Sequence, residues 1–205
     1  MPASNRVTAA RGTRLYLIRH GETPRQGFCN GHLDVALTSA GVSEIEAVAA
    51  RLTGESIAAL YTSDLGRARH SAEILGRRLH LTPSVSPPLR EKSFGEWEGL
   101  SQDELLRRFP DEWSDWLANP ADAKPTGGES VREMASRVLP VVAQIIKSHL
   151  GERVAIVAHG GVNRVILCHA LGLDLRYMER IEQRHAALNI IEFLEEEVVV
   201  QLLNG

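Results

Sequence analysis

The sequence predicts a three-layer α/β/α sandwich with a mostly parallel central sheet. Short apolar runs at 15–18, 57–61 and 153–158 have the near-continuous apolar character of strands that are covered on both faces. A segment with apolar residues at helical spacing follows each run. Buried strands that alternate with helices are typical of a parallel sheet with helices on both of its faces.

The composition is that of an ordinary globular protein. Of 205 residues, 43% are hydrophobic and 24% are charged, and the formal net charge is −3. This charge gives no general attraction to nucleic acid or to an anionic membrane, and no segment has the uninterrupted apolar length of a membrane helix. Cys29 and Cys168 are the only cysteines and form no metal-type or disulfide-type motif, which favours a reducing compartment and a cytoplasmic localisation.

The chain is expected to hold one domain behind a short tail. Residues 1–12 lack the apolar region of a signal peptide and are expected to form a flexible N-terminal tail. Residues 13–205 are expected to fold as a single domain, since this length can bury a sizeable core. Residues 92–128 interrupt the alternation of strands and helices, and we expect them to form a lid-like excursion above the carboxyl edge of the sheet.

The first half of the chain begins with the strand at 15–18 and continues through a glycine-rich loop at 24–34. A helix follows from about Thr38 and is ended by Gly54. Its buried face has the spacing i, i+3, i+4 and i+7 and consists of Ile45, Val48, Ala49 and Leu52. The helix after the strand at 57–61 is expected to be capped from a polar stretch made of Thr62, Ser63 and Asp64.

The second half is predicted to begin with a short strand at 83–88 and two short helices at 101–117, which Pro110 separates. Ser130 and Glu133 match a capping box and start a long helix, which Pro140 is expected to kink or to interrupt by one turn. The strand at 153–158 leads directly into a helix that Gly172 stops. Two closing strands are expected at 188–194 and 198–203.

Two of the predicted buried strands end in histidine followed by glycine. Ligands of open α/β sheets bind outside the carboxyl ends of the strands, so His20 and His159 would converge there if their strands are neighbours. Arg19 and Arg67 would supply fixed positive charge, and the helix after His159 would add backbone N–H donors. Arg-His-Gly taken alone could be a simple turn, but the recurrence of His-Gly at the end of a second buried strand indicates a pocket for one dianionic phosphoryl group.

The remaining histidines are expected to be structural or exposed. None of them pairs with another histidine or with a carboxylate at the spacing of a metal site, so the sequence implies no metal and no cofactor. They are His32, His70, His80, His149, His169 and His185. The three tryptophans, at 97, 113 and 116, either line a substrate entrance or pack the excursion onto the sheet, and packing is the simpler role for each of them.

At this point the sequence resembles the histidine phosphatase superfamily, which has a phosphoglycerate mutase-like fold. The resemblance is carried by an ordered set of motifs that covers most of the chain from about residue 14 onward. They are Leu-Ile-Arg-His-Gly-Glu-Thr at 17–23, Leu-Thr-x-x-Gly at 37–41, Thr-Ser-Asp-Leu-x-Arg-Ala-x-x-Ser-Ala at 62–72, Leu-Arg-Glu-x-x-Phe-Gly-x-Trp-Glu-Gly at 89–99, Gly-Gly-Glu-Ser at 127–130 and His-Gly-Gly at 159–161.

The resemblance implies a role for each of five side chains. His20 would be the nucleophile, and Arg19, Arg67 and His159 would hold the phosphoryl oxygens. Glu91 looks like the family's general acid, chosen over the nearby Glu96 and Glu98 from the family pattern. These roles agree with the chemistry, because phosphoryl transfer needs positioning and positive charge around the phosphoryl oxygens, and a leaving alkoxide needs a proton.

The substrate-binding set implied by the resemblance adds Gln26, Asn30, Gly31 and Gly160 to the arginines and His159. One position departs from the pattern. The family usually has asparagine six positions after the nucleophile, where this chain has Gln26. Its longer amide could reach the phosphate, or Asn30 could take its place.

The resemblance implies a metal-independent phosphomonoesterase, a phosphoric monoester hydrolase of the histidine acid phosphatase type that acts on a small phosphorylated metabolite. Phe28-Cys29-Asn30-Gly31-His32 and the motif at 89–99 are similar to the α-ribazole phosphatase branch. Sugar phosphates, glycerate phosphates and phosphoserine remain alternatives within the family. The rival functions are a cofactor-dependent phosphoglycerate mutase and a non-catalytic module that binds phosphorylated ligands. The oligomeric state stays open, with a homodimer among the assemblies allowed.

Overall fold

The computed structural model describes residues 12–24 and 26–205, and the expected tail therefore lies outside the described residues except for Gly12. Within this part of the chain, six strands form one sheet in the order β3-β2-β4-β1-β5-β6. The strands are β1 (Thr13–Arg19), β2 (Ile57–Thr62), β3 (Ser84–Val85), β4 (Arg153–Ala158), β5 (Leu188–Phe193) and β6 (Val198–Leu202). All neighbours pair in parallel except for β5, which is antiparallel to both β1 and β6. The predicted mostly parallel sheet is confirmed.

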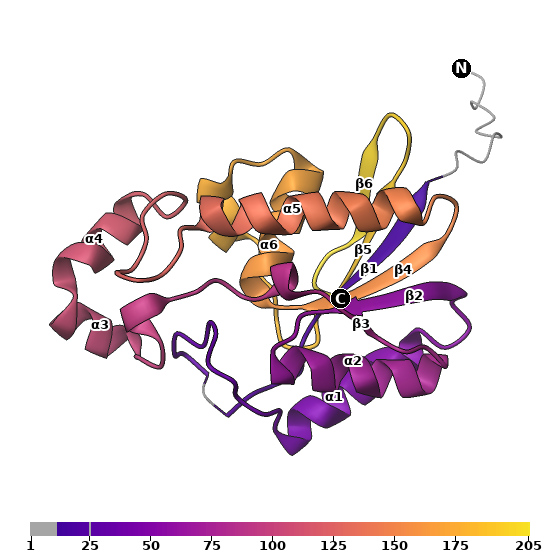
Figure 1. Cartoon of the computed structure of the whole chain (residues 1–205), viewed down its shortest axis with the longest axis horizontal. Coiled ribbons are helices and arrows are strands. Elements are labelled where there is room, and N and C mark those ends of the chain that lie inside the picture. Colours follow the sequence, from indigo (N-terminus) through magenta and orange to yellow (C-terminus); the bar gives the residue numbers. More distant parts are fainter. Residues whose placement is uncertain (1–11, 25) are drawn as a thin grey trace.

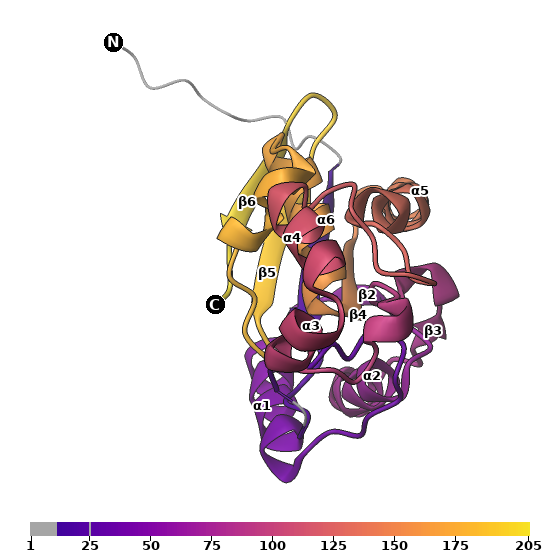
Figure 2. The same ribbon diagram turned by 90° about the vertical axis from the view of Figure 1, so that its left-hand side faces the viewer.

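Helices cover both faces of this sheet. Figure 1 shows α5 and α6 on one side and α1 and α2 on the other, which confirms the three-layer sandwich. The helices are α1 (Ser39–Arg51), α2 (Gly66–Leu79), α3 (Gln102–Arg108), α4 (Pro110–Ala118), α5 (Val131–Ser148) and α6 (Gly160–Leu171). Single 3₁₀ turns lie at Pro87–Leu89 and Gly95–Trp97, and a longer one lies at Leu175–Arg180. Figure 1 shows α3 and α4 together at one end of the molecule, and Figure 2 views the molecule from that end.

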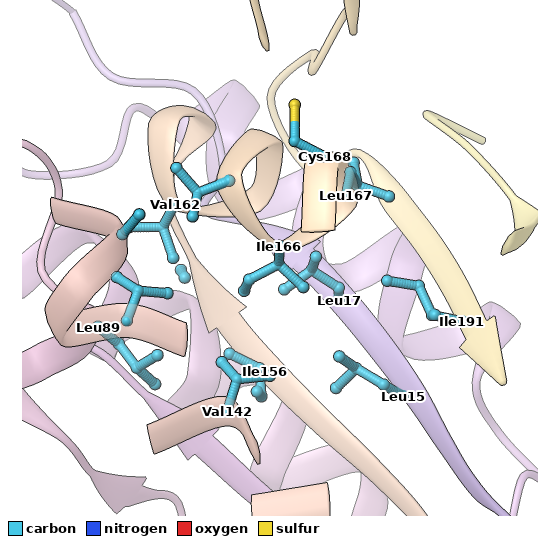
Figure 3. Close-up of a cluster of buried hydrophobic side chains, with 14 of the residues drawn as sticks. Leu15, Leu17, Leu89, Val142, Ile156, Val162, Ile166, Leu167, Cys168 and Ile191 are labelled. Carbon is cyan, nitrogen blue, oxygen red and sulfur yellow. The ribbon is translucent and has the colours of Figure 1, made fainter. Parts of the chain in front are cut away.

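The side chains of β1 belong to two cores. Leu15 and Leu17 pack on the side of α5 and α6, whereas Tyr16 and Ile18 pack on the side of α1 and α2. All four are at most 1% exposed, which explains why this strand reads as a continuous apolar run. Figure 3 shows Leu15 and Leu17 in the first of these cores, together with Ile156 and Ile166.

Several helix boundaries follow the sequence signals. The capping box of Ser130 and Glu133 is formed at the start of α5, and Gly172 caps α6 in the left-handed conformation with φ 65°. Pro110 occupies the first turn of α4, where its missing N–H costs nothing. Helix α5 runs without a break from Val131 to Ser148, so Pro140 does not replace one of its turns.

The start of α2 differs from the sequence expectation. Its N-cap is Leu65, and none of Thr62, Ser63 and Asp64 caps the helix through its side chain. The Gly66 N–H instead donates to Oδ1 of Asp34 at 2.8 Å. A carboxylate from a distant loop thus stabilises this helix N-terminus, because the helix dipole favours negative charge there. Asp64 forms an ion pair with Arg90 at 2.5 Å.

None of the helices in the described part of the chain combines the length and the hydropathy that crossing a bilayer requires.

The chain that leaves β1 passes very close to the first turn of α1. A Cβ atom at Gly41 would overlap the backbone oxygen and nitrogen of Glu22, and one at Gly21 would overlap the backbone of Gly41. Both contacts are with backbone atoms, which cannot move aside as a flexible side chain can. This close approach fixes the path of the chain directly after His20.

We expect Gly41→Ala to lower the free energy of unfolding by about 1–3 kcal/mol, because the added methyl group overpacks a backbone contact. Urea unfolding measures the change. Ser43→Ala, at an exposed position of the same helix, is the control and is expected to change stability by less than about 0.5 kcal/mol. Equal stability of the Gly41→Ala protein and the wild type would contradict the close packing.

Candidate active site

The carboxyl ends of β1 and β4 bring His20 and His159 together. Arg19 of β1 lies opposite Ala158 of β4, so the next residue of each strand reaches the same edge of the sheet. The imidazole centroids are 5.3 Å apart, with the ring planes at 62°. His20 is 5% exposed and His159 is fully buried. The predicted convergence of the two histidines is confirmed.

The hydrogen bonds of His20 define its tautomer. Nδ1 lies 2.7 Å from the Gly21 carbonyl oxygen, which only accepts, so Nδ1 carries the proton. Nε2 accepts from Nε–H of Arg67 at 3.3 Å and therefore presents a lone pair. Burial, together with the positive charges of Arg19 and Arg67, holds the pKa of His20 well below its usual value of 6.5. The ring is thus neutral at physiological pH, with Nε2 as its basic atom.

Arg67 connects His20 to the loop that follows β1. Its Nη1 donates to the Leu33 carbonyl at 2.7 Å, and its Nη2 donates to the carbonyls of Asn30 and Gly31 at 2.8 and 2.7 Å. Together with the bond to His20, these contacts use four of the five N–H groups of a guanidinium. Arg67 is 1% exposed, so its charge acts in an environment of low polarity.

Arg19 reaches the same place from the end of β1. Its Nη1 donates to the Gln183 carbonyl at 2.6 Å, and its Nη2 lies 3.1 Å from Nε2 of His185. The Nε atom of Arg19 is buried and has no hydrogen-bond partner among the described residues. The guanidinium thus keeps a donor for a ligand while two contacts hold it in position.

His185 corrects the sequence expectation that it would be structural or exposed. Its ring centroid lies 5.7 Å from that of His20, and it lines the same cavity. A guanidinium only donates, so Nε2 of His185 accepts from Arg19. Burial, followed by the charge of Arg19, lowers the pKa of His185 to about 4. His185 is therefore a neutral acceptor that orients Arg19.

The carboxylate of Glu91 is held by two backbone N–H groups. Oε1 accepts from Lys92 N at 2.9 Å and Oε2 accepts from Gly161 N at 3.0 Å. The Glu91 carbonyl also accepts from Nη2 of Arg137 and from Nε2 of His32, both at 2.9 Å. The carboxylate of Glu91 is therefore held at the start of α6, and its backbone carbonyl is held by α5 and by His32.

The two neighbouring glutamates have other environments. Oε1 of Glu98 accepts from the backbone N–H groups of His32 and Phe94 at 2.8 and 3.0 Å, so this carboxylate joins two loops. Glu96 is exposed. Of these three glutamates, only Glu91 lines the cavity beside His20.

His159 lies behind the wall of the cavity. Neither of its ring nitrogens has a hydrogen-bond partner in the described part of the chain. Burial and the charge of Arg67 hold its pKa well below 6.5. A buried imidazole with no partner is costly, and a phosphoryl oxygen beside His20 would supply an acceptor for it.

These groups surround a cavity of about 400 Å³. Arg19, His20, Arg67 and Glu91 line it, as do the predicted substrate-binding residues Gln26, Asn30 and Gly160. Gln26 donates to Oε2 of Glu22 at 2.9 Å. Gly31 is outside the lining and lies against the backbone of Lys92, while its carbonyl binds Arg67.

The cavity also contains residues to which the sequence analysis gave no role. Besides His185, those with polar side chains are Thr23, Lys92, Arg164 and Glu179. Thr23 stands within the first motif and could have been suspected from its place there. The three tryptophan rings pack on one another with centroids 5.1 to 6.0 Å apart, and Trp116 also lines the cavity. The described residues contain no group of three or more side chains suited to hold a metal ion.

Comparison with known proteins agrees with this geometry. Residues 15–205 match the family model of the histidine phosphatase superfamily (branch 1). The chain is 27% identical over 194 residues to the adenosylcobalamin/alpha-ribazole phosphatase of Escherichia coli, a match that covers 94% of this chain and 96% of that protein. It is 35% identical over 159 residues to the metal-independent phosphoserine phosphatase of Arabidopsis thaliana, covering 75% and 67% of the two chains.

Solved structures share the fold. The crystal structure of the alpha-ribazole phosphatase from Shigella flexneri superposes with a TM-score of 0.86 at 27% identity, covering 94% of this chain and 96% of that one.

Neutral, buried histidines make the stability of the fold depend on pH. In the unfolded chain, His20, His159 and His185 become protonated below about pH 6.5. In the folded chain their pKa values are lower, so they become protonated only at lower pH. We therefore expect the free energy of unfolding to fall as the pH drops below about 6.5, by about 1.4 kcal/mol per pH unit for each proton that only the unfolded chain binds.

Urea unfolding between about pH 7 and pH 5 measures this dependence. His159→Asn should make it shallower, because one titrating ring is removed. His70→Gln, at an exposed position, should leave it as in the wild type. An unchanged dependence in the His159→Asn protein would show that His159 is not held neutral by the fold.

Proposed function

The chain belongs to the histidine phosphatase superfamily (branch 1), and from that premise we propose that it hydrolyses the phosphate monoester of a small metabolite through a phosphohistidine intermediate. The observation that carries the proposal is the state of His20. Its Nδ1 proton is committed to the Gly21 carbonyl, and its Nε2 lone pair lies beside the Arg67 guanidinium at the cavity. A nucleophilic histidine needs a proton held on one ring nitrogen and a lone pair on the other.

The first step transfers the phosphoryl group to the protein. Nε2 of His20 attacks phosphorus, and the bond from phosphorus to the ester oxygen breaks. Glu91, in its protonated form, gives its proton to the departing oxygen, so that the product is a neutral alcohol. The guanidinium groups of Arg19 and Arg67 stabilise the negative charge on the phosphoryl oxygens, together with His159 and the backbone at Gly160.

The second step returns His20 to its starting state. The Glu91 carboxylate takes a proton from water, and the water oxygen attacks phosphorus as the bond to Nε2 breaks. Inorganic phosphate leaves, Glu91 is protonated again and His20 is neutral. The two backbone N–H donors on the Glu91 carboxylate and the Arg137 contacts behind it support this role, because they hold the carboxyl group in one position through both steps.

Several further assignments belong to this proposal. The enzyme would be a phosphoric monoester hydrolase of the histidine acid phosphatase type in its use of a histidine nucleophile, would need no metal or other cofactor, and would reside in the cytoplasm. Residues 13–205 would act as one domain with residues 92–128 as a lid-like excursion. Its partner is a small phosphorylated metabolite rather than a nucleic acid or a membrane, and a homodimer is one assembly in which it would work.

The two rival functions can be separated by their products. A phosphoglycerate mutase would convert 3-phosphoglycerate into 2-phosphoglycerate when 2,3-bisphosphoglycerate is present, and would release little inorganic phosphate. A non-catalytic binding module would bind a phosphate ester but would neither acquire a phosphoryl group nor release phosphate.

We expect His20→Ala to reduce turnover of p-nitrophenyl phosphate by about 10³-fold or more, because no other group can form the intermediate. The assay is run with EDTA, which should leave the wild-type rate unchanged. Wild-type protein quenched during turnover of ³²P-labelled substrate should carry an acid-labile label that His20→Ala lacks. His70→Ala serves as an exposed histidine control. Wild-type activity in His20→Ala, or its loss in EDTA, would contradict the mechanism.

We expect Glu91→Gln to slow an alkyl phosphate such as glycerol 3-phosphate by about 10²–10⁴-fold, because the alkoxide then leaves without a proton. With p-nitrophenyl phosphate, whose leaving group needs little protonation, the first step should survive. Rapid mixing should then give a burst of p-nitrophenolate followed by slow release of phosphate. Glu96→Gln, in the same segment but exposed, should behave as the wild type. An equal loss of rate on both substrates, with no burst, would show that Glu91 is not the general acid.

A further inference from the structure

The peptide group between Gly21 and Glu22 is hydrogen-bonded on both of its sides. Its carbonyl oxygen, on Gly21, accepts from Nδ1 of His20 at 2.7 Å. Its N–H, on Glu22, donates to Oε2 of Glu44 at 2.9 Å. The C=O and the N–H of a trans peptide point in opposite directions, so the imidazole and the carboxylate lie on opposite sides of this group. Glu44 is therefore joined to His20 through a single peptide unit.

The packing of α1 holds the Glu44 carboxylate at this place. Thr38, the N-cap of α1, donates its backbone N–H to the Glu22 carbonyl at 2.9 Å and its hydroxyl to Oε1 of Glu22 at 2.8 Å. A Cβ atom at Gly41 would overlap the backbone of Glu22. Residues three apart are neighbours on a helix surface, so Glu44 stands beside Gly41 and faces the same stretch of chain. The first turns of α1 thus bind the chain after His20 at several points.

The nearby positive charges make a positive imidazole costly. In the proposed mechanism Nδ1 keeps its proton while Nε2 takes the phosphoryl group, so the ring of the phosphohistidine carries a positive charge. Burial, Arg19 and Arg67 oppose a positive charge on His20, since they lower its pKa. Negative charge on the Nδ1 side offsets this opposition. The Glu44 charge also reaches Arg19, because burial lowers the pKa of Arg19 while Glu91 and Glu44 act in the opposite direction.

A hydrogen bond to a carboxylate polarises the peptide group that donates it. When the Glu22 N–H binds the charged Glu44 side chain, the Gly21 carbonyl oxygen becomes a stronger acceptor for the Nδ1 proton. This second bond strengthens as the ring becomes positive, so the effect is larger in the transition state than in free His20. In Ser-His-Asp triads a carboxylate bonded directly to the imidazole stabilises the imidazolium. Here one peptide group stands between the two.

We propose that Glu44 is a positioning residue that acts through the Gly21–Glu22 peptide to hold the Nδ1 proton of His20 and to stabilise the positive ring of the phosphohistidine. This inference rests on the proposed function, because it concerns the intermediate of that reaction. No bond to Glu44 forms or breaks, and Nδ1 keeps its proton throughout. The positive charge grows as the phosphoryl group arrives and disappears as it leaves, so Glu44 favours formation of the phosphohistidine and disfavours its breakdown.

The test measures the two steps separately. Glu44→Gln keeps an oxygen acceptor for the Glu22 N–H and removes the charge. In the Glu91→Gln background, the burst of p-nitrophenolate reports the first step and the release of phosphate reports the second. We expect Glu44→Gln to lower the burst rate about three- to tenfold, as the difference between a charged and a neutral acceptor allows, without slowing the release of phosphate.

Glu46→Gln is the matched control, because it removes a charge from an exposed position of the same helix and should change neither rate. Slowing of both steps by the same factor in Glu44→Gln would show a purely structural role and overturn the inference. If Glu44→Gln does not fold, Glu44→Ala carries the test. Acetate can then occupy the space of the carboxylate and should restore part of the burst rate, whereas acetamide should not. No recovery with acetate would also overturn the inference.

Proton NMR tests the hydrogen bond without turnover. The Nδ1 proton of His20, identified by its absence from the His20→Ala spectrum, should move upfield in Glu44→Gln, because the bond to Gly21 is weaker. It should stay in place in Glu46→Gln. This shift in a wild type that hydrolyses no phosphate ester would retain the action of Glu44 on His20 and refute the proposed hydrolysis. An unmoved proton, or an unchanged burst rate, in a protein that does hydrolyse phosphate esters would overturn the inference and leave the proposed function standing.

Discussion

The buried guanidinium of Arg67 is the constraint on which the rest of the site depends. A cation that is 1% exposed needs acceptors, and Arg67 finds them in His20 and in the carbonyls of Asn30, Gly31 and Leu33. The loop after β1 must therefore wrap around the start of α2, where Asp34 also caps the helix. One residue thus orients the basic nitrogen of His20 and shapes the wall of the cavity.

A second set of contacts holds the segment that carries Glu91. Arg137 donates to the backbone carbonyls of Pro88, Arg90 and Glu91, so α5 fixes the segment that carries the Glu91 carboxylate. The start of α6 then holds that carboxylate through Gly161 N. In the proposed mechanism, attack and proton transfer need His20 and Glu91 in fixed positions. These two side chains are held by elements from different layers of the sandwich.

Two parts of the fold build the cavity. Arg19 and His20 reach it from the carboxyl end of the central strand β1, where the packed sheet leaves little freedom. Lys92, Phe94 and Trp116 reach it from residues 92–128, where the tryptophan cluster packs Trp116 against the buried Trp97. A change in residues 92–128 can therefore alter the wall of the cavity while the position of His20 stays the same, because the sheet holds His20.

The sequence by itself determined the layered fold and the strand ends that carry His20 and His159, because periodicity is a local property of the chain. The order of the family's motifs pointed to Arg19, Arg67 and Glu91, and the structure places these three side chains at one cavity. Only the tertiary structure decided the contact of His185 with Arg19 and the burial of Lys92. His185 precedes β5, and the antiparallel pairing of β5 with β1 brings it to Arg19. The burial of Lys92 arises from aromatic rings that fold over it from other parts of the excursion. Such contacts depend on strand direction and packing, which no local pattern records.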